Sequence, residues 1–263
     1  MQRGDDSSLA RDFPDVLRKI RERTPARILT GRAGAAYRTP TQIELREAHA
    51  AARDAVSAEL DLESTFGAEF LKKWDLFEIC TEAPSKEEYL LQPDLGRHLN
   101  EASRQEVSRR CSKDRDIQLA IGDGLSVTAV AAQVPSLLPL LCEGARARSW
   151  TVGQPFVIRH CRVGVLNEIG DLLAPKVAVL LIGERPGLAT AESLSAYMAY
   201  RPSKVHTDAN RNLVSNIHSR GLKPQAAADR VVNLAAQMMT LEISGFQLRE
   251  QLPTTALPRA SEK

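Results

Sequence analysis

Lys-Val-Ala-Val-Leu-Leu-Ile, residues 176–182, contains the longest aliphatic run in this chain of 263 residues. Its apolar residues do not alternate with polar ones, as they would in a strand with one face in solvent. Such a run is typical of a strand buried on both faces, as in a parallel sheet covered by helices. It leads directly into Gly183-Glu184-Arg185-Pro186-Gly187. Open α/β sheets bind ligands beyond the carboxyl ends of their strands, so this loop is a candidate ligand site.

Strands and helices alternate around this run. Further strands are predicted at Ile117–Ile121, Pro155–Val163 and Leu194–Tyr200. Helical patterns lie between and after them: a stretch ending at Ala147 and broken or kinked near Pro135 and Pro139, then Leu166–Leu173 and Pro224–Glu242. The second half of the chain is therefore predicted to be an α/β layer domain with a mainly parallel sheet.

The first 110 residues have a different pattern. Asp12 and Pro14 predict the start of one helix, Thr39-Pro40 predicts the start of a second over Thr41–Leu60, and Glu101–Arg110 predicts another. We predict a mostly helical part with a frayed start over residues 1–110, the α/β domain over residues 111–250 and a loose tail over residues 251–263.

Composition excludes several classes of protein. The chain has 35 basic and 33 acidic residues, a formal charge of +2, which gives no argument for binding nucleic acid or an anionic membrane. The longest aliphatic run is far short of the ~20 residues of a membrane helix, and the first residues lack the apolar core of a secretory leader. The cysteines are isolated, which predicts reduced thiols in the cytoplasm and no metal site: Cys80, Cys111, Cys142 and Cys161.

Three polar segments are candidate binding sites, and each has a plainer interpretation. Gly122-Asp123-Gly124 follows a predicted strand, but it lacks a full glycine fingerprint and a tight turn is favoured. Residues 183–187 are interpreted either as a loop that binds a polar ligand or as a charged surface turn. Residues 206–218 form a binding loop, an interface, or an exposed turn before a helix. No nucleophile motif or P-loop is present, so these residues alone name no function.

Several motifs in a fixed order carry a resemblance. They are Gly31-Arg32-Ala33-Gly34, Pro93-Asp94-Leu95-Gly96-Arg97, Asp123-Gly124-Leu125-Ser126, Gly183-Glu184-Arg185-Pro186-Gly187-Leu188, Glu192-Ser193-Leu194-Ser195 and Ser215-Asn216-Ile217-His218. With them, the chain resembles the light chain of ethanolamine ammonia-lyase, an adenosylcobalamin-dependent bacterial enzyme, over most of its length.

The resemblance implies a small subunit that works with a large (heavy) subunit. The large subunit is implied to bind ethanolamine and to carry most of the chemistry, which converts ethanolamine to acetaldehyde and ammonia by a radical mechanism. This chain is implied to have a helical N-terminal part and a Rossmann-like C-terminal part, to help enclose adenosylcobalamin at the subunit interface, and to supply no catalytic acid or base.

The family's cofactor contacts fall on Val163, Glu184 and Leu213. Some relatives carry cysteine at the third position, so apolar packing or a backbone contact is expected there. Asp123 and Ser126 are expected to be further neighbours of the cofactor, because they follow a predicted strand.

Two further expectations concern location and rival functions. The cysteines predict a cytoplasmic protein, and the resemblance leaves enclosure in a bacterial microcompartment open. One alternative function is a non-catalytic module that only assembles large subunits. Another is a stand-alone Rossmann-like nucleotide-binding enzyme, which would need the complete glycine fingerprint that the chain lacks.

Overall fold

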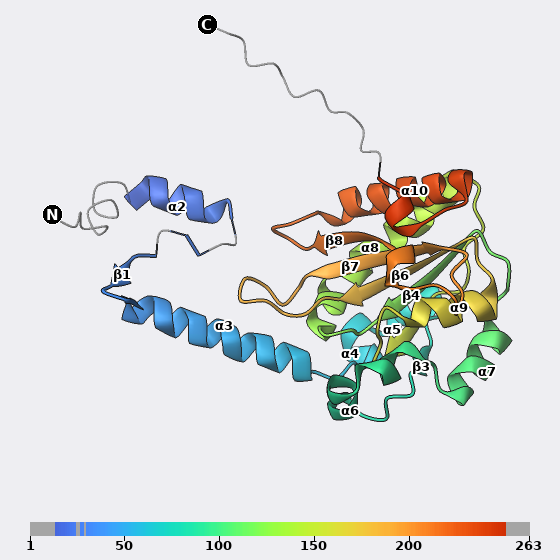
Figure 1. The fold of residues 1–263 in the computed structure, drawn as a ribbon, viewed down its shortest axis with the longest axis horizontal. Helices are drawn as coiled ribbons and strands as arrows, with labels where there is room; N and C mark the ends of the chain where they lie inside the picture. The colour runs from blue at the N-terminus through green and yellow to red at the C-terminus, as the bar shows by residue number, and fades with distance from the viewer. Residues whose placement is uncertain (1–13, 25–26, 29, 251–263) are drawn as a thin grey trace, which may run out of the picture.

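A six-stranded sheet forms the centre of the protein (Figure 1). The computed structural model describes residues 14–24, 27–28 and 30–250. The strands are, in spatial order, β3 (Glu78–Cys80), β5 (Phe156–Arg159), β4 (Ile117–Gly122), β6 (Val177–Gly183), β7 (Leu194–Tyr200) and β8 (Asn212–Ile217). Helices pack on both faces of this sheet, so the predicted α/β class is confirmed.

β6 contains the aliphatic run and lies inside the sheet. All of its residues are buried. It pairs in parallel with β4, from Ile117 opposite Val177 to Gly122 opposite Ile182, and antiparallel with β7. The pairings of β3 with β5, β5 with β4, and β4 with β6 are parallel, whereas β7 and β8 are added antiparallel. The sheet is therefore mainly parallel, as predicted, with an antiparallel extension at one side.

Alternate residues of β6 face two separate apolar clusters. Val179 and Leu181 pack with α8 (Val127–Ala147) and α10 (Pro224–Leu241) on one face. Leu180 and Ile182 pack on the other face, with buried residues of α7 (Glu101–Arg110) and α9 (Val165–Leu173). Burying a leucine or valine side chain contributes roughly 1.5–3 kcal/mol. The two-sided burial explains why this strand tolerates no polar residue.

α8 passes through Pro135 and Pro139 as one continuous helix, so a break there is wrong, whereas a kink stays a prediction. Its apolar residues pack against the sheet and α10, which holds it in place. Among the described residues, it is the one helix long and apolar enough to cross a membrane by length and composition. Half of its most apolar segment is buried inside the protein, as in the core helix of a soluble protein.

The N-terminal segments extend away from the sheet (Figure 1). They are α2 (Pro14–Glu22), the short strands β1 (Arg32–Ala33) and β2 (Ala36–Tyr37), and α3 (Thr39–Ser57). α3 corresponds to the helix predicted from Thr41 to Leu60, and Arg38, rather than Thr39, occupies its cap position. Its only buried residues are Thr41 and Ala55, so most of its surface lacks a partner within the described chain. Asp12 and the predicted tail lie outside the described residues.

Short elements then lead from α3 into the sheet. They are α4 (Leu62–Phe66), α5 (Ala68–Trp74), α6 (Lys86–Leu91) and the 3₁₀ turn η1 (Pro93–Arg97), with β3 between α5 and α6. β3 pairs with β5, although it belongs to the part predicted as helical. The division of the chain at residue 110 stays a prediction.

β8 is an edge strand that the sequence analysis did not predict. It occupies part of the polar stretch between residues 206 and 218, together with the 3₁₀ turn η2 (Asp208–Asn210). Only Val214 and Ile217 of β8 are buried. A half-exposed edge strand needs few apolar residues, so the polar composition of this segment gave no strand pattern in the sequence.

Asp116 joins the starts of β4 and β6. Its carboxylate lies 2.8 Å from Lys176 Nζ and accepts hydrogen bonds from the Thr151 N–H at 2.7 Å and the Thr151 hydroxyl at 2.8 Å. Partial burial acts to raise the pKa of Asp116, but Lys176 and Thr151 lower this pKa from 3.8 to about 2. The contacts therefore favour the folded state above the unfolded pKa, and this contribution is lost as the pH falls.

We expect the Asp116→Asn variant to lose less stability than the wild type between about pH 4 and pH 2, because it lacks this titration. Urea unfolding at a series of pH values measures the difference. Asp54→Asn, on the exposed surface of α3, is the control. Equal acid sensitivity of the wild type and Asp116→Asn would contradict the assignment.

Candidate functional site

The carboxyl ends of the parallel strands meet at one edge of the sheet. β4 leads into Asp123, β5 into His160 and β6 into Glu184. The start of β7 and the end of β8 reach the same edge, because Leu194 pairs with both Gly183 and Ile217. In open α/β folds this is the edge that binds ligands.

A buried carboxylate closes part of this edge. Asp123 is fully buried and accepts the backbone N–H groups of His160 at 2.9 Å and Cys161 at 2.8 Å. The Lys86 ammonium lies 3.8 Å from the same carboxylate and donates to the Gly124 carbonyl at 3.3 Å. Burial raises the pKa of Asp123, and Lys86 opposes this shift. Asp123 therefore fixes the path of the chain as it leaves β5.

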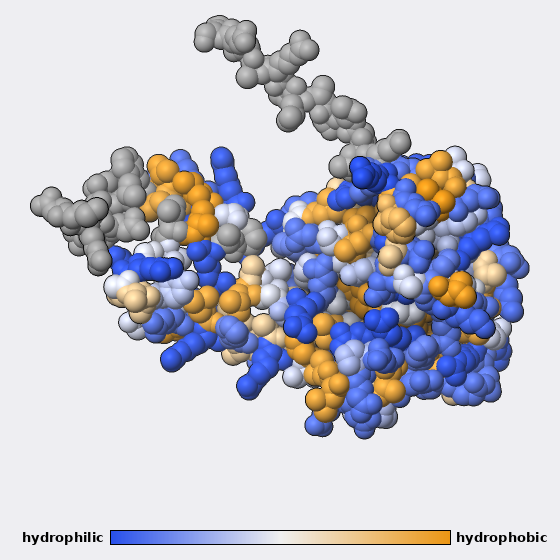
Figure 2. Space-filling view, viewed as in Figure 1, coloured by the Kyte–Doolittle hydropathy of each residue, from blue (hydrophilic) through white to orange (hydrophobic). Residues whose placement is uncertain are grey.

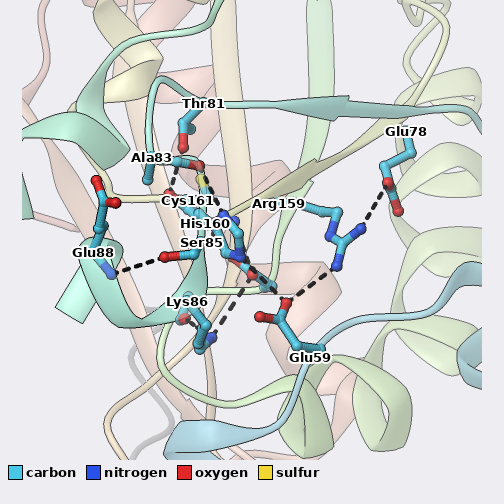
Figure 3. A network of polar contacts seen from close by, with 12 residues as sticks. Glu59, Glu78, Thr81, Ala83, Ser85, Lys86, Glu88, Arg159, His160 and Cys161 are labelled. Carbon is cyan, nitrogen blue, oxygen red and sulfur yellow. Dashed lines mark hydrogen bonds and ion pairs between the residues drawn. The ribbon is translucent and has the colours of Figure 1, made fainter.

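His160 extends this arrangement toward the N-terminal segments (Figure 3). Its Nδ1 lies 3.0 Å from the Ala83 carbonyl, and its Nε2 lies 3.2 Å from the Glu59 carboxylate. Both partners are acceptors, so both bonds form together only when the imidazole carries two protons. Arg159 connects Glu59, at 3.1 Å, to Glu78, at 3.5 Å. Partial burial acts to raise the pKa of Glu59, but hydrogen bonds from His160 and Arg159 lower it below its usual value.

Asp123 and Ser126 do not present their side chains to a ligand. Both residues are fully buried. The Ser126 hydroxyl accepts the Ala129 N–H at 3.2 Å, which caps α8, and donates to the Ala191 carbonyl at 2.5 Å. The polar atoms of both side chains are therefore used by neighbouring backbone, and the expectation that these residues are neighbours of the cofactor stays a prediction.

The Gly122-Asp123-Gly124 segment is a packing turn. A side chain at Gly122 would meet the Cys161 side chain at 2.7 Å, and one at Gly124 would meet the Gly183 carbonyl at 2.3 Å. Gly124 also has a φ of +57°. A side chain at Gly183 would lie 2.1 Å from the Ser126 carbonyl. These glycines allow the ends of β4 and β6 to approach each other closely, as the tight-turn interpretation predicts.

Glu184 is held at the junction of β6, β7 and β8. Its carboxylate accepts the Ser193 hydroxyl at 2.7 Å and the Ser195 hydroxyl, and it lies 3.4 Å from the Asn216 N–H. Ser195 is buried, whereas Glu184 remains partly exposed. The carboxylate is therefore fixed in direction, and its Oε2, which accepts only the Ser193 hydroxyl, keeps one lone pair for a further donor.

Leu213 and Val163 lie on the same side of the sheet as Tyr197. Leu213 is 42% exposed and pairs with Tyr197 across β7 and β8. Val163 is partly buried in the turn before α9, and both Val163 and Tyr197 pack against the cluster beneath α9. Leu213 is connected to Glu184 through β7, since Ser195 and Tyr197 are alternate residues of that strand. The role of the three residues in cofactor binding stays a prediction.

Two cavities flank these residues. One of about 530 Å³ is lined by Arg97, Gly164, Asn167, His206, Asp208 and Arg211, among others. In it, Arg211 is almost fully buried, pairs with Asp208 and donates to Asn167 at 2.9 Å. Burial lowers the pKa of Arg211. The second cavity, of about 620 Å³, is lined by residues of α3 and of the loops after β4, β5 and β6.

The sequence analysis missed the residues that orient Glu184. Ser193 and Ser195 belong to a quoted motif, Glu192-Ser193-Leu194-Ser195, but their contact with Glu184 depends on the antiparallel pairing of β6 with β7. In the described part of the chain, no three His, Cys, Asp or Glu side chains are grouped so as to hold a metal ion.

Comparison with known proteins assigns the family. A model described as "Ethanolamine ammonia-lyase light chain (EutC)" matches residues 14–249, nearly the whole described chain. The chain belongs to the ethanolamine ammonia-lyase light chain family. The expected resemblance is thereby confirmed, and the chain is an enzyme subunit of the ammonia-lyase class.

Curated relatives agree with this family. The chain is 39% identical over 235 residues to the ethanolamine ammonia-lyase small subunit of Clostridium acetobutylicum, covering 89% of this chain and 95% of the relative. It is 36% identical over 231 residues to the small subunit of Clostridium perfringens and 38% identical over 231 residues to that of Fusobacterium nucleatum. Each of these two matches covers 88% of this chain and 76% of the relative.

We expect Asp123→Ala to destabilise the protein by about 3–5 kcal/mol, because it leaves the buried Lys86 ammonium uncompensated and removes the acceptor of two backbone N–H groups. Urea unfolding followed by circular dichroism measures this loss. Adding Lys86→Met to Asp123→Ala should restore part of the stability. Asp229→Ala, at an exposed position of α10, is the control. A loss below about 1 kcal/mol for Asp123→Ala would contradict the role of this carboxylate.

Proposed function

We propose that this chain is the small subunit of an adenosylcobalamin-dependent ethanolamine ammonia-lyase, and that it binds the cofactor against a large subunit. The observation that carries this proposal is the Glu184 carboxylate. Ser193 and Ser195 orient it at the carboxyl edge of the sheet, and it remains partly exposed. The family membership and the small-subunit names of the relatives support the same function.

The residues at this edge fit a corrinoid. The corrin ring carries amide side chains, whose N–H groups are suitable donors to a fixed carboxylate such as Glu184. Leu213 offers an exposed apolar side chain beside Tyr197, and Val163 offers a partly buried one before α9. In this proposal Glu184 binds a ring amide, while Leu213 and Val163 pack on apolar parts of the ring.

The chemistry is divided between cofactor, large subunit and this chain. When bound, adenosylcobalamin supplies an organic radical by homolysis of its cobalt–carbon bond. The large subunit binds ethanolamine, which is converted to acetaldehyde and ammonia. This chain positions the cofactor and shields it from water. None of its residues is proposed as an acid or base of the reaction.

The N-terminal segments supply a surface for the large subunit. Exposed apolar side chains gather over α2 and α3 (Figure 2). They include Val16 and Ile20 of α2 and Ile43 of α3, of which Ile43 is 60% exposed, and Tyr37 of β2 is exposed between these helices in the chain. Exposed apolar surface on an extended segment is typical of a contact with another protein.

We also propose that the protein is located in the cytoplasm. The alternative is that it is enclosed in a bacterial microcompartment. The four cysteines are free in the structure, which fits a reducing compartment.

We expect Glu184→Ala to weaken cobalamin binding by the co-expressed complex about tenfold or more, because a charged hydrogen-bond acceptor is lost. Equilibrium dialysis of the complex against increasing concentrations of hydroxocobalamin measures the affinity. Glu192→Ala, at an exposed neighbouring position, should leave it unchanged. Normal affinity with lost turnover in Glu184→Ala would contradict the binding role.

Because the proposal assigns substrate binding to the large subunit and cofactor positioning to this chain, we expect ammonia-lyase activity only when both subunits are present. We would measure acetaldehyde release from ethanolamine and adenosylcobalamin with this chain alone, the large subunit alone, and both co-expressed. Activity only with both supports an obligate small subunit. Activity of the large subunit alone would favour the alternative, in which this chain is a non-catalytic assembly module.

A further inference from the structure

The larger cavity is a groove between α3 and the carboxyl edge of the sheet. Its volume is about 620 Å³. The C-terminal half of α3 contributes His49 and Arg53, and the sheet side contributes Arg162 after β5 and Arg185 after β6. The groove therefore combines basic side chains from two parts of the chain that are distant in sequence.

The groove carries uncompensated positive charge. Its lining includes three arginines and one histidine, and no Asp or Glu is among the lining residues. Within the described chain, Arg53, Arg162 and Arg185 form no ion pair. Arg159, at the same sheet edge, differs from these three because it forms ion pairs with Glu59 and Glu78. Several unpaired guanidinium groups around one hollow create a potential that favours an anion.

Arg162 is held in place while much of its hydrogen-bonding capacity stays unused. Its guanidinium carbon lies 4.3 Å from the centre of the Tyr89 ring, and Nη2 is 3.5 Å from the Tyr89 carbonyl. Its buried Nε has no partner. Tyr89 is itself fully buried and donates to the Cys161 carbonyl at 2.8 Å. The stacked guanidinium is thus pre-oriented, which reduces the entropy lost when it binds a ligand.

We propose that this groove binds the phosphate of the cofactor's nucleotide loop. The proposal rests on the proposed function, because Arg162 precedes Val163 and Arg185 follows Glu184 in the sequence. Cobalamin carries neutral amides around its ring and one phosphodiester on the nucleotide loop. The phosphodiester is a permanent anion, and guanidinium groups bind phosphate oxygens through paired hydrogen bonds.

The groove gives α3 a role in this site. His49 and Arg53 reach the groove from α3, whereas Arg162 and Arg185 reach it from the sheet. A phosphate between them joins α3 to the sheet by charge-assisted hydrogen bonds.

The test uses the co-expressed complex and two corrinoids that differ only in phosphate. Cobinamide lacks the nucleotide loop, and cobinamide phosphate adds the phosphate alone. Hydroxocobalamin is the third ligand, and equilibrium dialysis measures all affinities. We expect the wild type to bind cobinamide phosphate at least tenfold more tightly than cobinamide. This preference should shrink as salt is raised, because the interaction is between charges at the surface.

The double variant, Arg162→Gln and Arg185→Gln, should lose most of the preference for cobinamide phosphate over cobinamide. It should bind cobinamide as the wild type does. Arg53→Gln, at an exposed position of α3, should lower the preference by a smaller factor. Arg146→Gln, at the exposed end of α8 near the opposite sheet edge, is the matched control. Thermal unfolding of each complex checks that the variants are folded.

The outcomes separate the two proposals. A wild type that binds hydroxocobalamin but does not distinguish the two cobinamides overturns the phosphate site and leaves the proposed function intact. Equal weakening of all three ligands by the double variant also overturns it, since the arginines would then act on the ring. A wild type that binds none of the corrinoids contradicts the proposed function, and the phosphate site with it.

Discussion

The Asp123 carboxylate is the contact on which the carboxyl edge of the sheet depends. It lies at the end of β4, yet it binds the first two backbone N–H groups after β5 and faces the Lys86 ammonium. Three separate segments are thereby fixed around one buried charge, which is stable only because each partner is present. The next residues along the chain are Arg162 and Val163. The position of Arg162 in the groove lining therefore depends on this contact.

The sequence predicted the centre of the fold better than its borders. Six consecutive aliphatic residues in β6 have one physical explanation, burial on both faces, and the structure agrees. β3 and β8 lie at the two sides of the sheet, where backbone pairing with one neighbour decides the structure. Such pairing leaves little trace in side-chain composition. The continuity of α8 through Pro135 was likewise decided by packing against α10 and the sheet.

The candidate site was likewise predicted only in part from the sequence. The loop after β6 was identified from its position behind a buried strand, and the resemblance pointed to Glu184 within it. Ser193 and Ser195 could not be connected to Glu184, because their contact requires the register of an antiparallel pair. The structural use of Asp123 and Ser126 was missed for a related reason. A polar residue after a strand looks available in sequence, but these two are used by neighbouring backbone.

The close approach of β4 and β6 also bears on how sequence variation in this family should be interpreted. At Gly183 any side chain would collide with the Ser126 carbonyl, and at Gly124 with the backbone of Gly183. Selection at these positions therefore acts on the spacing of two strands, whatever molecule the loops bind. An unvarying glycine next to Glu184 would mark this architectural constraint, even in a relative that had lost its ligand. Substitution patterns at Arg185 and Leu213, whose side chains are exposed, are the ones that carry information about ligand chemistry.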